Sequence, residues 1–158
     1  MDLNLFDLNF WKNTTVILGV IVSTYSLFTG VSEYSKQGTQ KRANYFFELQ
    51  RRFKEKDIFK KICLLCNNDD PAIKEIPPKD RIDLLNFYEE LSLAMNSKLI
   101  KKEVIHYMFG YYVIKCWRSN NLWYDLEKDN PRWKLFHELA IQMEELDTKS
   151  LEYNRLKL

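Results

Sequence analysis

Near its start the chain carries 20 consecutive residues without a charged side chain, residues 13–32, bracketed by Lys12 and Glu33. As an α-helix, 20 residues extend about 30 Å, which is the thickness of the hydrocarbon core of a bilayer. Aromatic residues flank this stretch, as they flank membrane spans at the two interfaces: Phe6, Phe10, Trp11 and Tyr34. The pattern predicts a single transmembrane helix over residues 13–32.

Two other interpretations of residues 13–32 stay open. A soluble protein of 158 residues could use this stretch as the central helix of its core. The stretch could also belong to a cleaved signal peptide, although Asp2 and Asp7 precede it and no small-residue cleavage site follows. Its position and its flanking aromatic residues favour the membrane anchor.

Basic residues are concentrated directly after the uncharged stretch. Residues 36–61 hold nine Lys and Arg against three Asp and Glu, whereas residues 62–158 hold 14 against 16. Under the positive-inside rule, this asymmetry predicts a single-pass protein with residues 1–12 outside and residues 62–158 in the cytoplasm.

Residues 33–61 then form a basic amphipathic neck between the membrane helix and the cytoplasmic domain. We expect four of its side chains to contact anionic lipid headgroups, with RNA phosphates as the alternative ligand. These side chains are Lys41, Arg42, Arg51 and Arg52.

Small residues form a stripe along the predicted membrane helix. Gly19, Ser23, Ser26 and Gly30 are spaced so that they share one helical face. Small residues let membrane helices approach closely, and one span in the chain means that the packing partner comes from another chain. The stripe predicts a homo-oligomer, and the alternative is a passive anchor with incidental small residues.

The remainder predicts an all-α fold, a helical bundle with no strand-like alternation. The expected helices cover residues 40–55, 57–67, 81–96, 100–117 and 130–146. Apolar residues at helical spacing predict the buried faces, as with Phe46, Leu49 and Phe53 in the first of these helices.

Helix starts and breaks follow from capping and loop residues. Asp57, Asp80 and Asn130 are the expected N-caps, the last because Asn130-Pro131 has the cap and first-turn proline signature. Residues 67–78 hold Asn, Asp and Pro clusters and predict a loop.

The sequence offers little catalytic machinery. Cys63 and Cys66 form a lone C-x-x-C, and Cys116, His106 and His137 do not supply a second paired set of zinc ligands. We expect three reduced, mostly buried thiols, no metal and no cofactor. The chain lacks P-loop, dinucleotide-binding and serine-hydrolase motifs, so we do not expect an enzyme of these classes.

Arg132 and His137 form the one pattern with catalytic content, an Arg followed by four residues and a His. It resembles the motif of HEPN domains, which are small helical bundles. In that family an Arg/His pair from each of two protomers builds a metal-independent ribonuclease site. We interpret the motif as a marker of a HEPN-like bundle. The alternatives are catalysis by these two residues, or a surface Arg132 with His137 as an ordinary bundle residue.

One predicted span, a basic neck, a helical domain and this Arg/His motif together resemble the small membrane accessory proteins encoded beside the RNA-guided ribonuclease of type VI-B CRISPR systems. The resemblance covers Phe10 to about Leu146. The stretch from Arg81 to Gly110 also resembles a wider group of bacterial single-span proteins.

The resemblance implies an oligomeric, pore-like assembly in the bacterial inner membrane. That assembly would act in antiviral defence downstream of the ribonuclease, by perturbing the membrane during phage infection. Two alternatives remain: a membrane-tethered ribonuclease that uses Arg132 and His137, and a membrane adaptor that recruits a nuclease partner or RNA through its basic neck.

Overall fold

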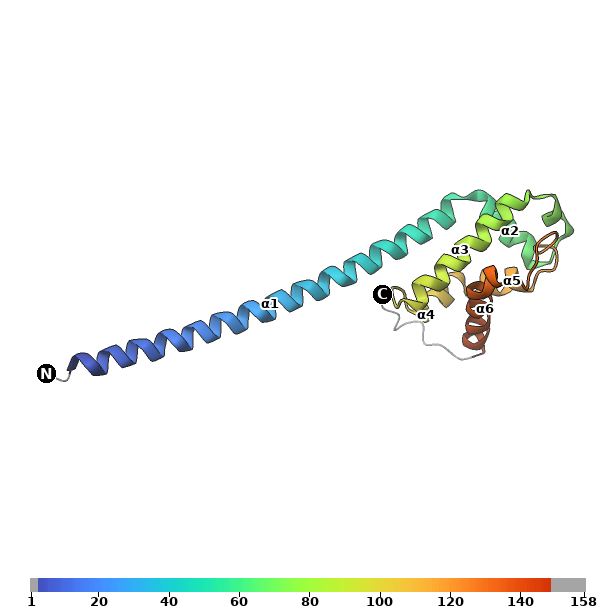
Figure 1. Cartoon of the computed structure of the whole chain (residues 1–158). Coiled ribbons are helices and arrows are strands. Elements are labelled where there is room, and N and C mark those ends of the chain that lie inside the picture. The colour runs from blue at the N-terminus through green and yellow to red at the C-terminus, as the bar shows by residue number, and fades with distance from the viewer. Residues whose placement is uncertain (1–2, 149–158) are drawn as a thin grey trace. The chain divides into compact units, whose positions relative to one another are not determined.

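The computed structural model describes residues 3–148, and within this range the side chains of residues 3–15, 17 and 35 lie outside the description. All elements in the described range are helical and it contains no strand, so the all-α prediction is confirmed (Figure 1). The α-helices are α1 (Leu3–Glu55), α2 (Asp57–Asn67), α3 (Pro78–Asn96), α4 (Lys102–Ile105), α5 (Tyr111–Arg118) and α6 (Lys134–Asp147).

The chain divides into two compact units, Met1–Lys41 and Arg42–Leu158. The boundary falls inside α1 and inside the predicted neck. Residues 42–55 of α1 belong to the second unit, together with every later element. The predicted apolar face of this segment is confirmed, because Phe46, Leu49 and Phe53 are all buried.

The second unit, which we name the bundle unit, is a bundle of helices around an aromatic core. Helix α6 packs against both α3 and α5, and α5 also packs against α2 (Figure 1). Between α3 and α6, the rings of Tyr88 and Phe136 stack with their centroids 4.8 Å apart. The predicted inward face of the last helix is confirmed by the burial of Trp133, Phe136, Ala140 and Met143.

The predicted helix over residues 100–117 is confirmed as helical from Lys102 onward, but it is not an α-helix throughout. A π-helical turn, His106–Gly110, separates α4 from α5. Gly110 lies where a Cβ atom would come within 2.8 Å of the His106 ring, so the absence of a side chain leaves room for that ring. A π-turn adds one residue to the helical repeat, and apolar spacing alone does not reveal the added residue.

Two predicted helix caps are also wrong, whereas a third is confirmed. The residues at the N-cap positions of α2 and α3 are Lys56 and Pro77, so Asp57 and Asp80 lie inside the first turns instead. Acidic residues in a first turn still interact favourably with the helix dipole. Asn130 is the predicted cap, and its side chain accepts a 3.0 Å hydrogen bond from the backbone N–H of Arg132.

That cap opens a short 3-10 turn, Pro131–Trp133, ahead of α6. A second 3-10 turn, Pro71–Glu75, lies within the predicted loop over residues 67–78. The Asp70 side chain caps it by accepting a 2.9 Å hydrogen bond from the N–H of Ala72.

Arg81 is the largest of the fully buried side chains, with 1% of its surface exposed. Its guanidinium donates hydrogen bonds to the backbone carbonyls of Ile76, at 3.2 Å, and Leu122, at 3.1 Å, and also to that of Tyr124. A buried carbonyl group without a hydrogen-bond donor destabilises the folded state. Arg81 alone therefore supplies donors to backbone carbonyls that no helical hydrogen bond satisfies.

We therefore expect Arg81→Met to lower the free energy of unfolding by about 3 kcal/mol or more, because it leaves carbonyl groups buried without donors. Denaturant unfolding measured by tryptophan fluorescence checks this. Arg118→Met is the matched control, since Arg118 is exposed and pairs with Glu144 at 2.8 Å. Its expected cost is about 1 kcal/mol or less. Equal losses in the two variants would contradict the role assigned to Arg81.

Candidate functional site

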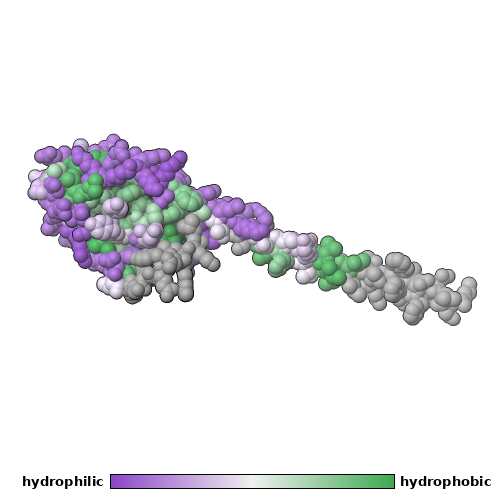
Figure 2. Space-filling view, turned by 180° about the vertical axis from the view of Figure 1, so that it is seen from behind, coloured by the Kyte–Doolittle hydropathy of each residue, from purple (hydrophilic) through white to green (hydrophobic). Residues whose placement is uncertain are grey.

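The described part of α1 that precedes the bundle unit has a strongly apolar surface. Ten large apolar or aromatic side chains in this segment are 57–82% exposed. In Figure 2 hydrophobic residues form a green patch on this helix. The ten side chains are Val16, Leu18, Val20, Ile21, Val22, Tyr25, Leu27, Phe28, Val31 and Tyr34.

These side chains surround most of the helix and leave one face for small residues. At 100° per residue they cover about 240° of the circumference. The predicted stripe of Gly19, Ser23, Ser26 and Gly30 falls within the remaining arc. A Cβ atom added to Gly19 or to Gly30 would meet no atom within 4 Å, so space is open beside both glycines.

Three hydroxyl groups in this segment are hydrogen-bonded within the helix itself. Ser23 Oγ donates to the carbonyl of Gly19 and Thr24 Oγ1 to that of Val20, both at 2.8 Å. Thr29 Oγ1 donates to the carbonyl of Ser26 at 2.9 Å. These hydroxyls therefore have partners that do not depend on water.

No helix among the described residues combines the length and the mean hydropathy of a candidate membrane span. The predicted span begins at residues 13–15, whose side chains lie outside the described part of the chain. The transmembrane helix therefore stays a prediction.

The four basic residues predicted to contact a membrane surface or RNA have different environments. Lys41 is exposed, and Arg42 lines a pocket of the bundle unit. Arg51 lies 3.9 Å from Glu55 on the surface. Arg52 pairs with Glu90 at 2.6 Å, and its guanidinium lies 6.0 Å from the centre of the Phe87 ring. Arg52 is thus tied to α3, and the predicted contacts remain untested.

Arg132 of the predicted HEPN-like motif has partners on the bundle surface. Its guanidinium lies 4.8 Å from the centre of the Trp133 ring and donates a 3.2 Å hydrogen bond to Asn86 Oδ1. The side chain is exposed, and α3 and the turn before α6 together fix its direction.

His137 of the same motif stacks on a different aromatic ring. Its imidazole lies parallel to Trp117, with centroids 4.7 Å apart. It lines a shallow pocket of about 290 Å³ with Trp117, Lys128 and Lys134, and Arg132 is not among the lining residues. The structure therefore holds the two motif residues on separate aromatic partners, and a catalytic role stays untested.

Lys128 contributes a half-buried cation to this pocket. Its ammonium donates a 2.7 Å hydrogen bond to the carbonyl of Trp117 and lies 4.6 Å from the centre of that ring. Burial lowers the pKa of Lys128 from its ordinary value.

The three cysteines are free and buried, so the predicted burial of the thiols is confirmed. Cys63 Sγ lies 3.9 Å from Cys116 Sγ, and the Tyr88 hydroxyl lies 3.4 Å from the first sulfur and 3.6 Å from the second. Burial raises the pKa of Cys116 and of Tyr88 well above their ordinary values, so both groups are neutral at pH 7. Within the described chain, no set of three His, Cys, Asp or Glu side chains is placed to hold a metal ion.

The spacing of Cys63 and Cys66 in the sequence places both on one short helix. It does not indicate that Tyr88 and Cys116 lie beside this helix in the folded protein. Each of these two residues lies on the apolar face of its own helix, which is the one signal that could have indicated the cluster.

A family model described as "Domain of unknown function (DUF4760)" matches residues 13–142, which is most of the chain. The chain belongs to this family. The match begins at the first residue of the uncharged stretch and ends within α6, so the family model includes the stretch and most of the bundle. No curated protein and no solved structure matches the chain.

We expect the three native thiols to react with Ellman's reagent only as the protein unfolds, because burial excludes the reagent and keeps Cys116 protonated. Absorbance at the thionitrobenzoate band measures the reaction with and without denaturant. Leu93→Cys supplies the positive control, because Leu93 is 53% exposed. Its added thiol should react at once in the folded protein. Equally fast reaction of the unmodified chain would contradict the buried cluster.

Proposed function

We propose that this chain is a membrane-anchored helical protein that assembles with copies of itself and perturbs the membrane through that assembly. The observation that carries the proposal is the surface of α1 between residues 16 and 34, where ten large apolar side chains are exposed.

The energetic argument starts from that exposed surface. Burying one large apolar side chain is favourable by about 1.5–3 kcal/mol. Contiguous apolar patches of this kind on a soluble monomer mark a surface that something else covers. Residues 13–32 contain no charge, so a bilayer can cover the helix on all sides without taking up an ion.

The hydroxyl groups of this segment also favour a lipid environment. A helix in lipid satisfies its backbone internally, and hydroxyls that donate to its own carbonyls leave no unpaired donor. Ser23, Thr24 and Thr29 all do so. The family model also begins at residue 13, so the whole uncharged stretch lies within the matched region.

The charges after the stretch orient the proposed anchor. Nine basic residues against three acidic ones in residues 36–61 favour the inner face of the bacterial inner membrane. The bundle unit then lies in the cytoplasm.

Self-association follows from the small-residue face. Open space beside Gly19 and Gly30 permits a second helix backbone to approach closely, which is how membrane helices pack. The resemblance to the type VI-B accessory proteins supports a pore-like assembly and a functional link to an RNA-guided ribonuclease. We assign the chain no enzymatic activity of its own.

The anchor predicts that the wild-type chain stays in the membrane pellet after alkaline carbonate extraction. We expect Ile21→Lys with Leu27→Lys to move it into the supernatant, because each lysine at the centre of a span costs about 2.5–3.5 kcal/mol. Immunoblotting of the pellet and supernatant measures the shift.

Phe47→Lys is the control for added charge, since Phe47 is 55% exposed on the part of α1 that belongs to the bundle unit. This variant should stay in the pellet. Complete carbonate extraction of the wild-type chain would contradict the anchor.

The packing face predicts that Gly19→Ile with Ser23→Ile lowers the oligomeric mass of the full-length chain in detergent, because the larger side chains fill the space for a neighbouring helix. Light scattering coupled to size exclusion measures this mass. Val20→Ile with Thr24→Ile is the matched control, with the same spacing one residue further along. Equal masses for the wild-type chain and the stripe variant would remove the stripe from the proposal.

A further inference from the structure

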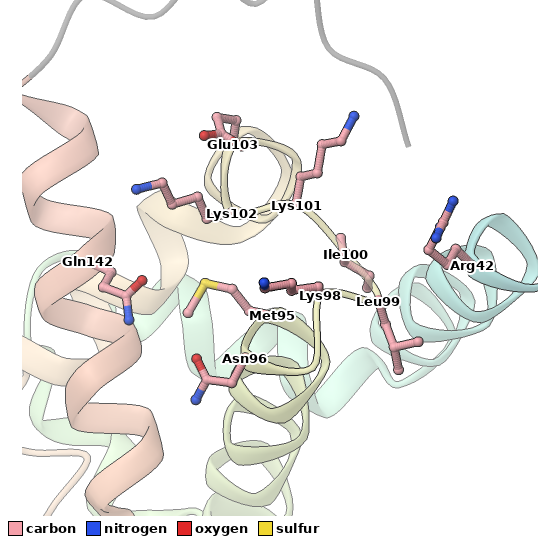
Figure 3. Close-up of a pocket in the computed structure, with 10 residues that line it drawn as sticks. All are labelled: Arg42, Met95, Asn96, Lys98, Leu99, Ile100, Lys101, Lys102, Glu103 and Gln142. Atoms are coloured by element: carbon pink, nitrogen blue, oxygen red, sulfur yellow. The ribbon is translucent and has the colours of Figure 1, made fainter. Parts of the chain in front are cut away.

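The largest pocket described in the bundle unit opens between the start of that unit, the end of α3, α4 and α6, and has a volume of about 530 Å³. Figure 3 shows the lining side chains: Lys102 points to the side of Gln142, Lys101 points the other way on the side of Arg42, and Lys98 lies beside Met95. Of its lining residues, only Arg42 belongs to a site predicted from the sequence.

The lining is strongly basic. It contains Arg42, Lys98, Lys101 and Lys102, with Glu103 as its single carboxylate. Within the part of the chain that the structure describes, the three lysines form no ion pair, whereas other exposed cations such as Lys56 and Lys60 do. Several cations around one hollow create a positive potential that attracts an anion.

Lys98 has a backbone conformation that lysine rarely adopts, with φ at +57°. It follows the C-cap of α3, where the N–H of Lys98 bonds the carbonyl of Met95 and the N–H of Leu99 bonds that of Ala94. This is the Schellman arrangement, in which glycine is the usual residue at the left-handed position. The fold would therefore accept glycine here, and the lysine adds a charge to the pocket at the expense of backbone strain.

The other walls of the pocket are apolar or neutral. Met95, Leu99 and Ile100 supply apolar surface, and Asn96 and Gln142 supply side-chain amides. A ligand that fits this lining carries anionic oxygens for the lysines and an apolar portion for the hydrophobic wall. Phosphate esters of an amphiphile meet both requirements.

The pocket lies close in sequence to the proposed membrane span, and this favours a lipid headgroup as the source of such a phosphate. Arg42 follows Ser32, the last uncharged residue of the proposed span, by ten residues. Ten residues reach at most about 35 Å even when fully extended, so an anchored chain confines the pocket to the vicinity of the membrane surface.

We propose that Lys98, Lys101 and Lys102, together with Arg42, bind the phosphate of an anionic phospholipid headgroup in this pocket. This inference rests on the proposed membrane anchor for the source of the ligand, and on the pocket itself for the chemistry.

The test titrates the full-length chain in a non-ionic detergent and follows thermal unfolding by tryptophan fluorescence. The probes are short-chain phosphatidylglycerol, which is anionic, short-chain phosphatidylcholine, which has no net charge, and inorganic phosphate. A ligand that binds the folded state raises Tm. We expect near-saturating phosphatidylglycerol to raise Tm by about 5 °C, and phosphatidylcholine and inorganic phosphate to have little effect.

The triple variant Lys98→Gly, Lys101→Gln, Lys102→Gln should lose this Tm increase. Lys98→Gly alone should raise Tm without lipid or leave it unchanged, since glycine relieves the left-handed strain, and it should weaken the lipid response. A binding role is thereby separated from a structural one. The matched control Lys54→Gln, Lys61→Gln, Lys79→Gln removes the same charge from exposed positions outside the pocket and should respond as the wild type does.

If the control variant lost the Tm increase equally, the pocket would not be the binding site, because any surface charge would then produce the response. An equal response to inorganic phosphate would overturn the lipid assignment. No phosphatidylglycerol response in the wild-type chain would overturn the proposal altogether. Carbonate extraction fails or succeeds independently of this titration, so a failed anchor and a failed pocket are distinguishable.

Discussion

The ring of Phe53 ties helix α1 to the rest of the bundle unit. Its centroid lies 5.5 Å from that of Phe87, 5.4 Å from Phe109 and 5.7 Å from Tyr112. Three later elements of the chain therefore meet on one side chain of α1. The helix is buried at this end, whereas the residues 16–34 that precede it expose their apolar side chains. Helix α1 thus has one part that is buried in the bundle and one part that exposes apolar side chains. Basic residues that follow the uncharged stretch lie between these two parts.

Two charged side chains, Asp69 and Arg81, form hydrogen bonds to the loop segment that follows α5. Burial opposes ionisation of Asp69, but hydrogen bonds from the Ser119 hydroxyl, at 2.6 Å, and the N–H of Asn121, at 2.9 Å, outweigh it and lower the pKa of Asp69. Arg81 supplies donors to the same segment at the carbonyls of Leu122 and Tyr124. With the backbone of this loop held by two charged side chains, Leu122 is fully buried in the core.

Apolar periodicity was sufficient to predict the helical class and most buried faces, because the helices of a bundle bury one stripe each. It could not predict the π-helical turn His106–Gly110, since apolar spacing alone does not reveal the one residue that such a turn adds. It also could not predict the burial of Arg81, because its acceptors are backbone carbonyls up to 43 residues away in sequence. Likewise, the basic pocket depends on Arg42, Lys98 and Gln142, which are far apart in the chain and meet only in the folded unit.

Under the proposed function, the composition of α1 would link anchoring to assembly. Glycine, serine and threonine lower the mean hydropathy of residues 13–32, and two glycines and two of the serines make up the face that we propose packs against neighbouring copies. Lipid provides no hydrophobic drive for helices to associate, so close packing of small residues has to supply it. In the proposed assembly, that face would contact a neighbouring copy, and large side chains on the remaining 240° or so of the helix would be available to contact lipid. Insertion and self-association would then stabilise each other, because the least apolar face of the anchor is the one that a neighbouring copy covers.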